Sequence, residues 1–375
     1  VGGEFCERCA SGDEGGGFYN SYFAYEGARG TFDRNVLRDN TAGGDGGGFY
    51  SDSFGYDGSD ASFLENVVVD NVSDGDGGGV YMYYPAYYAT LAFNRNVITG
   101  NIAIDGYGGG VYIEYFEYGA RVGFKDNVIS HNVISSTGSY GGGGLYLYSI
   151  NEGSIVWMTG NEFNDNIGTG YGGGLYMDDY VDYGSVWTFE DNEIQRNWTM
   201  GDGGGCYFAN YWYDGSVVYF NRNLINANTA LGSYGGCYFY DIEYAEIDFI
   251  GNQVNHNTAG GNYGGLYFES VYDGAVMRFW DNQIISNRAG ITETRYLSAS
   301  VVYTDPVVMG GDYGGLFLQD IQSGGEVDFQ RNQILSNTAY LTSTTGGSYA
   351  GMYVDLDNNG LLTMVDNVSV GNKAQ

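Results

Sequence analysis

The chain has 375 residues, among them 65 glycines, 38 tyrosines and only two prolines, and its formal net charge is −32. With 14 Lys and Arg against 46 Asp and Glu, it lacks the clustered positive charge that binding to nucleic acid or to an anionic membrane requires. Glycine-rich acidic chains can be disordered, but 43% of these residues are hydrophobic and recur periodically, which predicts a folded protein.

One short pattern recurs along the whole chain. Each copy begins with a run of glycines, and successive runs are about 31 residues apart. The runs end at Gly17, Gly48, Gly79, Gly110, Gly144, Gly174, Gly205, Gly236, Gly265, Gly315 and Gly351. A repeat of this length indicates a chain built by stacking similar units.

Two asparagines follow each glycine run. The first lies three residues after an aromatic residue or Met, and the second lies five residues further on, as in Phe124, Asn127 and Asn132. Because buried polar groups need hydrogen-bond partners, we expect the asparagines of successive copies to form amide ladders at two corners of the fold.

Within a copy, apolar and polar positions alternate, as in Leu145 to Tyr148. This period of two predicts half-buried strands, and no segment has the apolar stripe of a helix. We expect three short strands per copy: one after the glycine run, one before the Phe or Met, and one between the asparagines. Stacked copies would form an all-β parallel solenoid of eleven coils, a single domain over 1–375.

The repeat is interrupted at few places. Residues 1–14 precede the first glycine run and form the N-terminal edge, and extra residues fall at one corner, at 133–141, 288–312 and 338–349. A long loop on a rigid scaffold is a candidate functional element, with a tolerated insertion as the alternative. We expect the open ends of the solenoid to stack on further copies unless flanking segments cap them.

The paired motifs resemble the GGA(I/L/V) and FxxN repeats of chlamydial-type polymorphic outer membrane proteins. FxxN reads here as FDRN, FNRN, FKDN, FEDN, FIGN, FWDN and FQRN, and the glycine run is followed by Val, Leu, Phe or Cys. The resemblance extends from Gly15 to Asn372. It implies a right-handed parallel β-helix that is secreted, lies at a cell surface and is linked to adhesion.

One position after the glycine run is aromatic in every copy. We expect these side chains to point outward and to stack about 4.8 Å apart as an exposed ladder. The ladder is either self-supporting or a contact face for a second copy or for sugar rings. Its members are Tyr19, Tyr50, Tyr81, Tyr112, Tyr146, Tyr176, Tyr207, Tyr238, Tyr267, Phe317 and Tyr353.

The chain has four cysteines, too few for a disulfide framework. Cys206 and Cys237 occupy the same inward position in consecutive copies, so they lie within disulfide range and are either bonded or buried as space-fillers. Cys6 and Cys9 have CxxC spacing without the second pair that a zinc site needs, which favours a local or inter-subunit bridge.

Asp45, Asp76 and Asp202 precede glycine runs and are the candidate calcium ligands. Calcium needs several oxygens that converge on one ion, so solvated turn carboxylates are the alternative. No other cofactor is expected. The two histidines occupy the same corner position before the second Asn, which favours a structural corner residue over a catalytic base.

These observations favour an extracellular structural protein over an enzyme, because no copy carries a catalytic set. The leading hypothesis is a homopolymer, a filament or surface-layer subunit that assembles through the tyrosine face and the open ends. The alternative is an adhesin or glycan-binding surface protein, and the third possibility is a polysaccharide lyase or hydrolase. No apolar run approaches the roughly 18 residues of a membrane-spanning helix.

Overall fold

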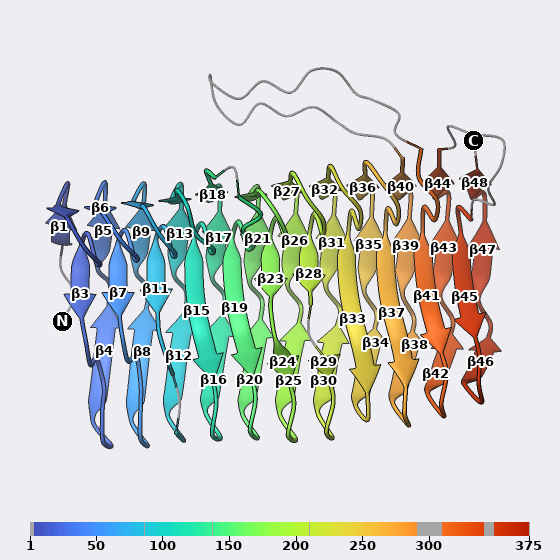
Figure 1. Ribbon diagram of the computed structural model, residues 1–375, viewed down its shortest axis with the longest axis horizontal. Helices are drawn as coiled ribbons and strands as arrows, with labels where there is room; N and C mark the ends of the chain where they lie inside the picture. The colour runs from blue at the N-terminus through green and yellow to red at the C-terminus, as the bar shows by residue number, and fades with distance from the viewer. Residues whose placement is uncertain are drawn as a thin grey trace.

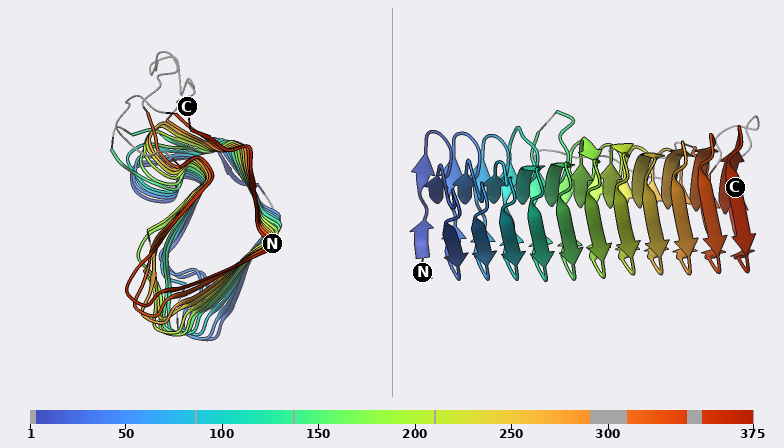
Figure 2. Two further views of the ribbon diagram at one scale, coloured as in Figure 1. Left: turned by 90° about the vertical axis from the view of Figure 1, so that its right-hand side faces the viewer. Right: turned by 90° about the horizontal axis from the view of Figure 1, so that it is seen from below.

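The computed structural model describes residues 4–85, 87–136, 138–209, 211–290, 310–340 and 349–374. They form a parallel β-solenoid of about 11 turns with about 31 residues per turn, in which no described residue is helical. Figure 1 shows the coils side by side along one axis, and the end-on view in Figure 2 shows that they share one outline. The predicted all-β parallel solenoid is therefore confirmed.

Four parallel sheets run the length of the rod, and they are numbered here in the order that a coil visits them. Sheet 1 follows the glycine run and comprises β3 (Phe18–Asn20), β7 (Phe49–Ser51), β11 (Val80–Met82), β15 (Val111–Phe116), β19 (Leu145–Ile150), β23 (Leu175–Met177), β28 (Cys206–Phe208), β33 (Cys237–Glu243), β37 (Leu266–Tyr272), β41 (Leu316–Ile321) and β45 (Met352–Leu356), with β24 (Tyr180–Val181) and β29 (Tyr211–Trp212) beside this path.

Sheet 2 contains the Phe or Met column, and every one of its strands has five residues. It comprises β4 (Arg29–Asp33), β8 (Asp60–Leu64), β12 (Thr90–Asn94), β16 (Arg121–Lys125), β20 (Ile155–Thr159), β25 (Val186–Glu190), β30 (Val217–Asn221), β34 (Glu246–Ile250), β38 (Val276–Trp280), β42 (Glu326–Gln330) and β46 (Leu361–Val365).

Sheet 3 lies between the two asparagine columns. It comprises β1 (Glu4–Glu7), β5 (Val36–Arg38), β9 (Val67–Val69), β13 (Val97–Thr99), β17 (Val128–Ser130), β21 (Glu162–Asn164), β26 (Glu193–Gln195), β31 (Leu224–Asn226), β35 (Gln253–Asn255), β39 (Gln283–Ile285), β43 (Gln333–Leu335) and β47 (Val368–Val370).

Sheet 4 follows the second asparagine and consists of two-residue strands. They are β2 (Ala10–Ser11), β6 (Thr41–Ala42), β10 (Val72–Ser73), β14 (Ile102–Ala103), β18 (Val133–Ile134), β22 (Ile167–Gly168), β27 (Trp198–Thr199), β32 (Thr229–Ala230), β36 (Thr258–Ala259), β40 (Arg288–Ala289), β44 (Thr338–Ala339) and β48 (Lys373–Ala374). Each coil therefore contributes a strand to four sheets, and the prediction of three strands per coil is wrong. Sheet 4 escaped prediction because two residues are too few to show an alternation.

The strands stack in register, so each repeat position becomes a column. Phe93 pairs with Phe63 on one side and with Phe124 on the other, with ring centroids 5.0 and 5.1 Å apart. All three rings are buried in one continuous core between the sheets. Stacking of this kind buries apolar surface that a single coil would leave exposed to water.

Both asparagine ladders are confirmed, and they run without a break from Asn35 to Asn367 and from Asn40 to Asn372. In a typical step, the backbone N–H and the side-chain Nδ2 of Asn127 donate to Oδ1 of Asn161, at 3.1 and 2.8 Å. Nδ2 of Asn127 also donates to the carbonyl of Phe93 at 2.8 Å. The ladders thus satisfy backbone and amide groups at corners that water does not reach.

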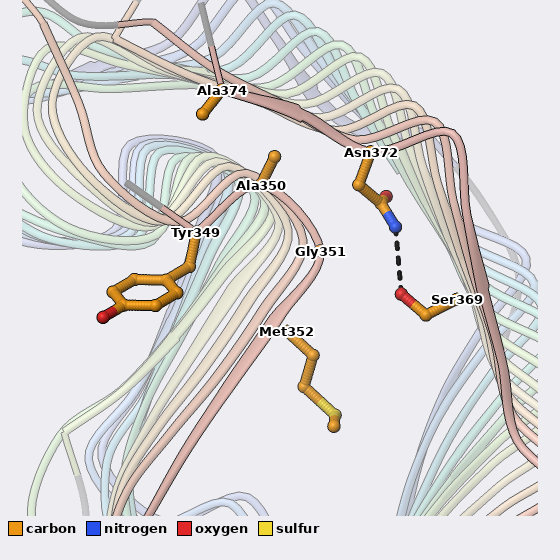
Figure 3. Close-up of a pocket in the computed structure, with 7 residues that line it drawn as sticks. All are labelled: Tyr349, Ala350, Gly351, Met352, Ser369, Asn372 and Ala374. Atoms are coloured by element: carbon orange, nitrogen blue, oxygen red, sulfur yellow. Dashed lines mark hydrogen bonds between the residues drawn. The ribbon is translucent and has the colours of Figure 1, made fainter. Parts of the chain in front are cut away.

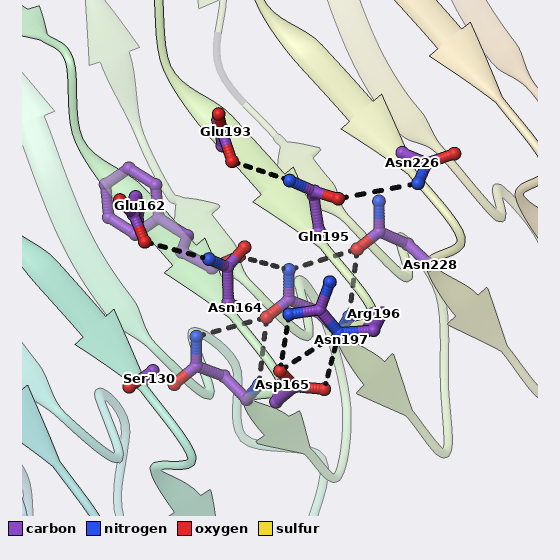
Figure 4. A network of polar contacts seen from close by, with 12 residues as sticks. Ser130, Glu162, Asn164, Asp165, Glu193, Gln195, Arg196, Asn197, Asn226 and Asn228 are labelled. Carbon is purple, nitrogen blue, oxygen red and sulfur yellow. Dashed lines mark hydrogen bonds and ion pairs between the residues drawn. The ribbon is translucent and has the colours of Figure 1, made fainter.

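Charged side chains lie on the outside of these corners. Arg196, which precedes the ladder residue Asn197, donates from Nε and Nη2 to the carboxylate of Asp165 in the preceding coil, at 2.8 to 3.1 Å (Figure 4). Both partners are partly exposed, so the pair contributes little stability beside the buried amide ladder.

The N-terminal edge and the inserted segments depart from the regular repeat. The N-terminal edge adds β1 and β2, which pair with β5 and β6, so residues 4–7 and 10–11 already belong to the sheets. Most of the predicted corner insertions at 288–312 and 338–349 lies outside the described residues. The smaller insertion at 133–141 begins with β18 and then leads to the next glycine run.

Candidate functional site: the tyrosine seam

The aromatic column of sheet 1 forms one continuous row of ring contacts, which we call the tyrosine seam. The rings are stacked except at Tyr176, which meets Tyr146 and Tyr207 edge to face. Register partners are Tyr81 with Tyr50 and with Tyr112, and these rings are nearly parallel, with centroids 4.8 and 4.9 Å apart. The seam contains Tyr19, Tyr50, Tyr81, Tyr112, Tyr146, Tyr176, Tyr207, Tyr238, Tyr267, Phe317 and Tyr353. The predicted stacking is confirmed for every step except the two at Tyr176.

The prediction that this ladder is exposed is wrong for most of its members. Tyr50, Tyr81 and Tyr146 are only 8%, 7% and 3% exposed, whereas Tyr19 at one end is 50% exposed. The same low exposure holds for Tyr112, Tyr176, Tyr238, Tyr267 and Phe317. The seam therefore forms a second apolar core, separate from the interior of the solenoid.

The glycine turns and further tyrosines provide the cover. A Cβ atom on Gly46 would lie 2.8 Å from Cβ of Tyr50, and one on Gly203 would lie 2.7 Å from Cβ of Tyr207. Both glycines have positive φ, so the turn can lie against the seam only without a side chain. Tyr107 packs on the seam from outside.

A second tyrosine column, which the sequence analysis missed, covers the later coils. Tyr234, Tyr263 and Tyr313 have φ of 62 to 63° at positions where earlier coils have glycine. Their rings stack on one another at 5.2 and 5.1 Å and lie against Tyr238, Tyr267 and Phe317. The sequence signal was the recurring Tyr-Gly-Gly that replaces Gly-Gly-Gly.

The seam hydroxyls are hydrogen-bonded to a row of carboxylates on the outer face of sheet 1. The hydroxyl of Tyr50 donates to Asp52 at 2.6 Å, and the hydroxyl of Tyr81 donates to Glu114 at 3.4 Å. The same arrangement recurs for Tyr146 with Asp178 and for Tyr238 with Glu269. These four phenols thus have partners, as the burial of a polar group requires.

Burial raises the pKa of Glu114 from 4.5 to about 7, and nearby Asp76 adds to the shift. Because the folded pKa lies above the unfolded one, the folded chain binds this proton more tightly. The contribution of Glu114 to the free energy of unfolding should therefore be fully present below about pH 4.5, and it should be lost as the pH rises to about 7. Melting temperatures between pH 4.5 and 7.5 test this, and E114Q should flatten the slope. An unchanged slope in E114Q would contradict the assignment.

The three predicted calcium ligands act as hydrogen-bond acceptors between coils. Oδ1 of Asp45 accepts the backbone N–H of Asp76 at 2.7 Å, and Oδ1 of Asp76 accepts that of Tyr107 at 2.6 Å. Oδ1 of Asp202 accepts that of Ser233 at 2.6 Å. Among the described residues, no group of three or more His, Cys, Asp or Glu side chains could hold a metal ion.

Burial raises the pKa of Asp76 to about 6 and also raises that of Asp45 and Asp202. In each case the hydrogen bond from the backbone of the next coil opposes the shift. These carboxylates are therefore part of the turn that closes over the seam.

The cysteines fall into two classes. Cys206 and Cys237 are register partners in sheet 1, and both are buried free thiols rather than a disulfide. Burial raises the pKa of Cys206, and a hydrogen bond with Cys237 adds to the shift. Cys9 is disulfide-bonded, whereas the side chain of Cys6, its expected partner, lies outside those that the structure describes.

We expect the native chain to react with no thiol reagent at Cys206 or Cys237, because both thiols are buried and burial raises the pKa of Cys206. After unfolding in denaturant without a reductant, both should be titrated by a chromogenic disulfide reagent. Rapid labelling of either residue in the folded chain would show that sheet 1 opens there.

An open pocket of about 380 Å³ lies on the last described coil (Figure 3). Met352, Ser369 and Asn372 line it, and Nδ2 of Asn372 donates to Oγ of Ser369 at 3.1 Å. Ser369 pairs with Ile334, so a hydroxyl takes the place of an apolar core residue in this coil.

The fold and the seam define the class of the protein: a tyrosine-rich parallel β-solenoid. Comparison of the chain with models of protein families, with curated proteins and with solved structures finds no match. The described part of the chain has no helix that is long and apolar enough to cross a membrane.

Proposed function

We propose that the chain is an extracellular structural rod that assembles into a filament or surface layer. The observation that carries the proposal is the pair of unbroken asparagine ladders, which bind all successive coils in one register. A fold in which every coil repeats the same buried contacts supports a mechanical or spacing role. The resemblance of its repeats to those of polymorphic outer membrane proteins supports the surface location.

The last described coil supports contact with a second copy. Leu361 and Val368 are 52% and 47% exposed, and their register partners in the preceding coil are Glu326 and Gln333. The same two outward positions are also apolar in some other coils, as at Val217 and Val97, so the last coil differs from the preceding coil but not from every coil. Exposed apolar patches of this kind mark protein interfaces. We propose that another copy covers this coil, rather than that the tyrosine seam provides the contact.

Glycan binding is the second candidate, with the row of carboxylates on sheet 1 in its favour. Sugar rings bind to the faces of aromatic side chains, but the seam rings cover one another's faces at about 5 Å. Most seam rings therefore offer no free face to a sugar, which favours assembly over glycan adhesion. A polysaccharide lyase or hydrolase stays the third candidate.

Negative-stain images and light scattering of the purified chain test the proposal. We expect filaments or sheets of laterally ordered rods, and only single rods in the variant L361E/V368Q, which restores the polar character of the preceding coil. A stable monomer of the unmodified chain at high concentration would eliminate self-assembly. Binding on a glycan array, or release of unsaturated or reducing sugar ends, would support the second or third candidate instead.

A further inference from the structure

We propose that the tyrosine seam is a relay for oxidising equivalents along the rod, an activity separate from the structural role. From Tyr19 to Tyr267, successive ring centroids lie 4.5 to 5.7 Å apart. Electron tunnelling slows steeply with distance, so a series of short steps carries charge over a length that one step cannot. Tyrosine is among the side chains that a one-electron oxidant oxidises most readily.

A tyrosine serves best as a relay where its phenolic proton has a nearby acceptor, because the oxidised phenol is a strong acid. Asp52 is placed for this role at the start of the seam: its two carboxylate oxygens accept from Tyr19 at 3.4 Å and from Tyr50 at 2.6 Å. Further along, Glu114 accepts from Tyr81 and Asp178 accepts from Tyr146.

The first step along the seam is balanced in electrons and protons. A one-electron oxidant takes an electron from Tyr19, whose phenolic proton moves to Asp52 and leaves a phenoxyl radical. Tyr50 then gives an electron to that radical and its proton to the other oxygen of Asp52, while the first proton returns to Tyr19. The net result is that the radical has moved one coil and Tyr19 is again a neutral phenol.

The burial of the seam suits such a relay. Most of its rings are 3% to 8% exposed, so little of each ring is open to soluble reductants between steps. Tyr19 is the most exposed member of the seam at 50%, and it offers an oxidant a point of access at one end.

Phe317 interrupts the phenols of the seam, and a bypass crosses the same coil. Tyr313 stacks on Tyr263 at 5.1 Å and reaches Tyr353 at 5.6 Å. Tyr263 in turn contacts Tyr267 at 4.4 Å. Among the ring contacts of the described residues, Tyr313 is therefore the phenol through which the path to Tyr353 must pass.

The test uses a ruthenium polypyridyl complex attached at S21C, beside Tyr19, and oxidised to ruthenium(III) by a flash and a quencher. Cys206 and Cys237 are buried and do not compete for the label. Tyr353 is replaced by 3-aminotyrosine, which traps the radical because it is more easily oxidised and has its own electron paramagnetic resonance spectrum.

We expect a radical at position 353 in this chain and its loss in Y313F and in Y81F, because a phenyl ring does not act as a relay. Phe317 already occupies the seam at 5.2 Å from Tyr267, so these substitutions fit the stack. Y272F, which removes a phenol that bonds Asp241 and Glu243 away from the seam, should leave the signal unchanged.

Circular dichroism spectra that match the parent confirm that each variant is folded. No radical at position 353 in the parent chain would overturn the proposal. So would a signal in folded Y313F and Y81F equal to that in Y272F, since the charge would then travel by another route. Filament formation in the same samples reports on the structural role separately.

Discussion

Replacement of Asn197 by alanine is expected to destabilise the rod by about 3 to 5 kcal/mol, because it leaves several buried polar groups without partners. Oδ1 of Asn197 accepts from the backbone N–H and from Nδ2 of Asn166, and its Nδ2 donates to the carbonyl of Phe163 and to Asn228. None of these groups can turn to water, since the ladder residues are fully buried.

The measurement must resolve single coils, because each coil of a solenoid contacts only its neighbours and opens partly on its own. Hydrogen exchange followed by mass spectrometry should show faster exchange in the coils around Asn197, with a lower midpoint of urea unfolding. Gln195, two residues before Asn197 at the end of β26, bonds Glu193 at the surface, so Q195A is the matched control and should change stability by less than about 0.5 kcal/mol. Equal exchange in the two variants would refute the importance of the ladder.

Alanine at Gly173 is the second large effect that we expect. Its Cβ would lie 2.6 Å from the carbonyl oxygen of Gly204 and 2.7 Å from that of Trp198, and both of these are backbone atoms of the next coil. The overlap can be relieved only by separating the coils, which weakens the hydrogen bonds from Gly174 and Leu175 to Gly205. We expect a loss of about 3 kcal/mol.

Gly184 provides the comparison. It has φ of +72° in a surface turn, and a Cβ there would meet nothing within 4 Å. G184A should therefore show only the strain of the left-handed conformation, about 1 kcal/mol. Thermal unfolding of the two variants separates close packing between coils from backbone strain within one coil. If G184A proved as destabilised as G173A, the contact between coils would not be the cause.

The sequence predicted the columns of the fold, because stacking in register follows directly from the repeat. Phe93 and Phe124 meet as expected, and the asparagines from Asn35 onward form their ladder. The fourth strand of each coil could not be read in the same way. Thr41–Ala42 is too short for a pattern, and only the register with its neighbours identifies it as a strand.

The burial of the tyrosine seam escaped prediction for a different reason. The alternation of side chains places Tyr112 correctly on the face of sheet 1 that points away from the main core. What covers the seam is partly the backbone of the glycine turns, and a residue without a side chain has no hydropathy pattern. The free state of Cys206 and Cys237 also could not follow from spacing, since register sets proximity but not oxidation.

Asn282 and Asn332 are 50 positions apart in the chain, yet they are joined by ladder bonds of 2.9 and 3.0 Å like those of any other step. Additional sequence between two coils therefore leaves the pitch of the rod unchanged. This corner is a natural grafting site: a peptide or small domain inserted there would be displayed at a fixed height along the axis. Several such insertions would be spaced along the axis at multiples of the distance between neighbouring coils.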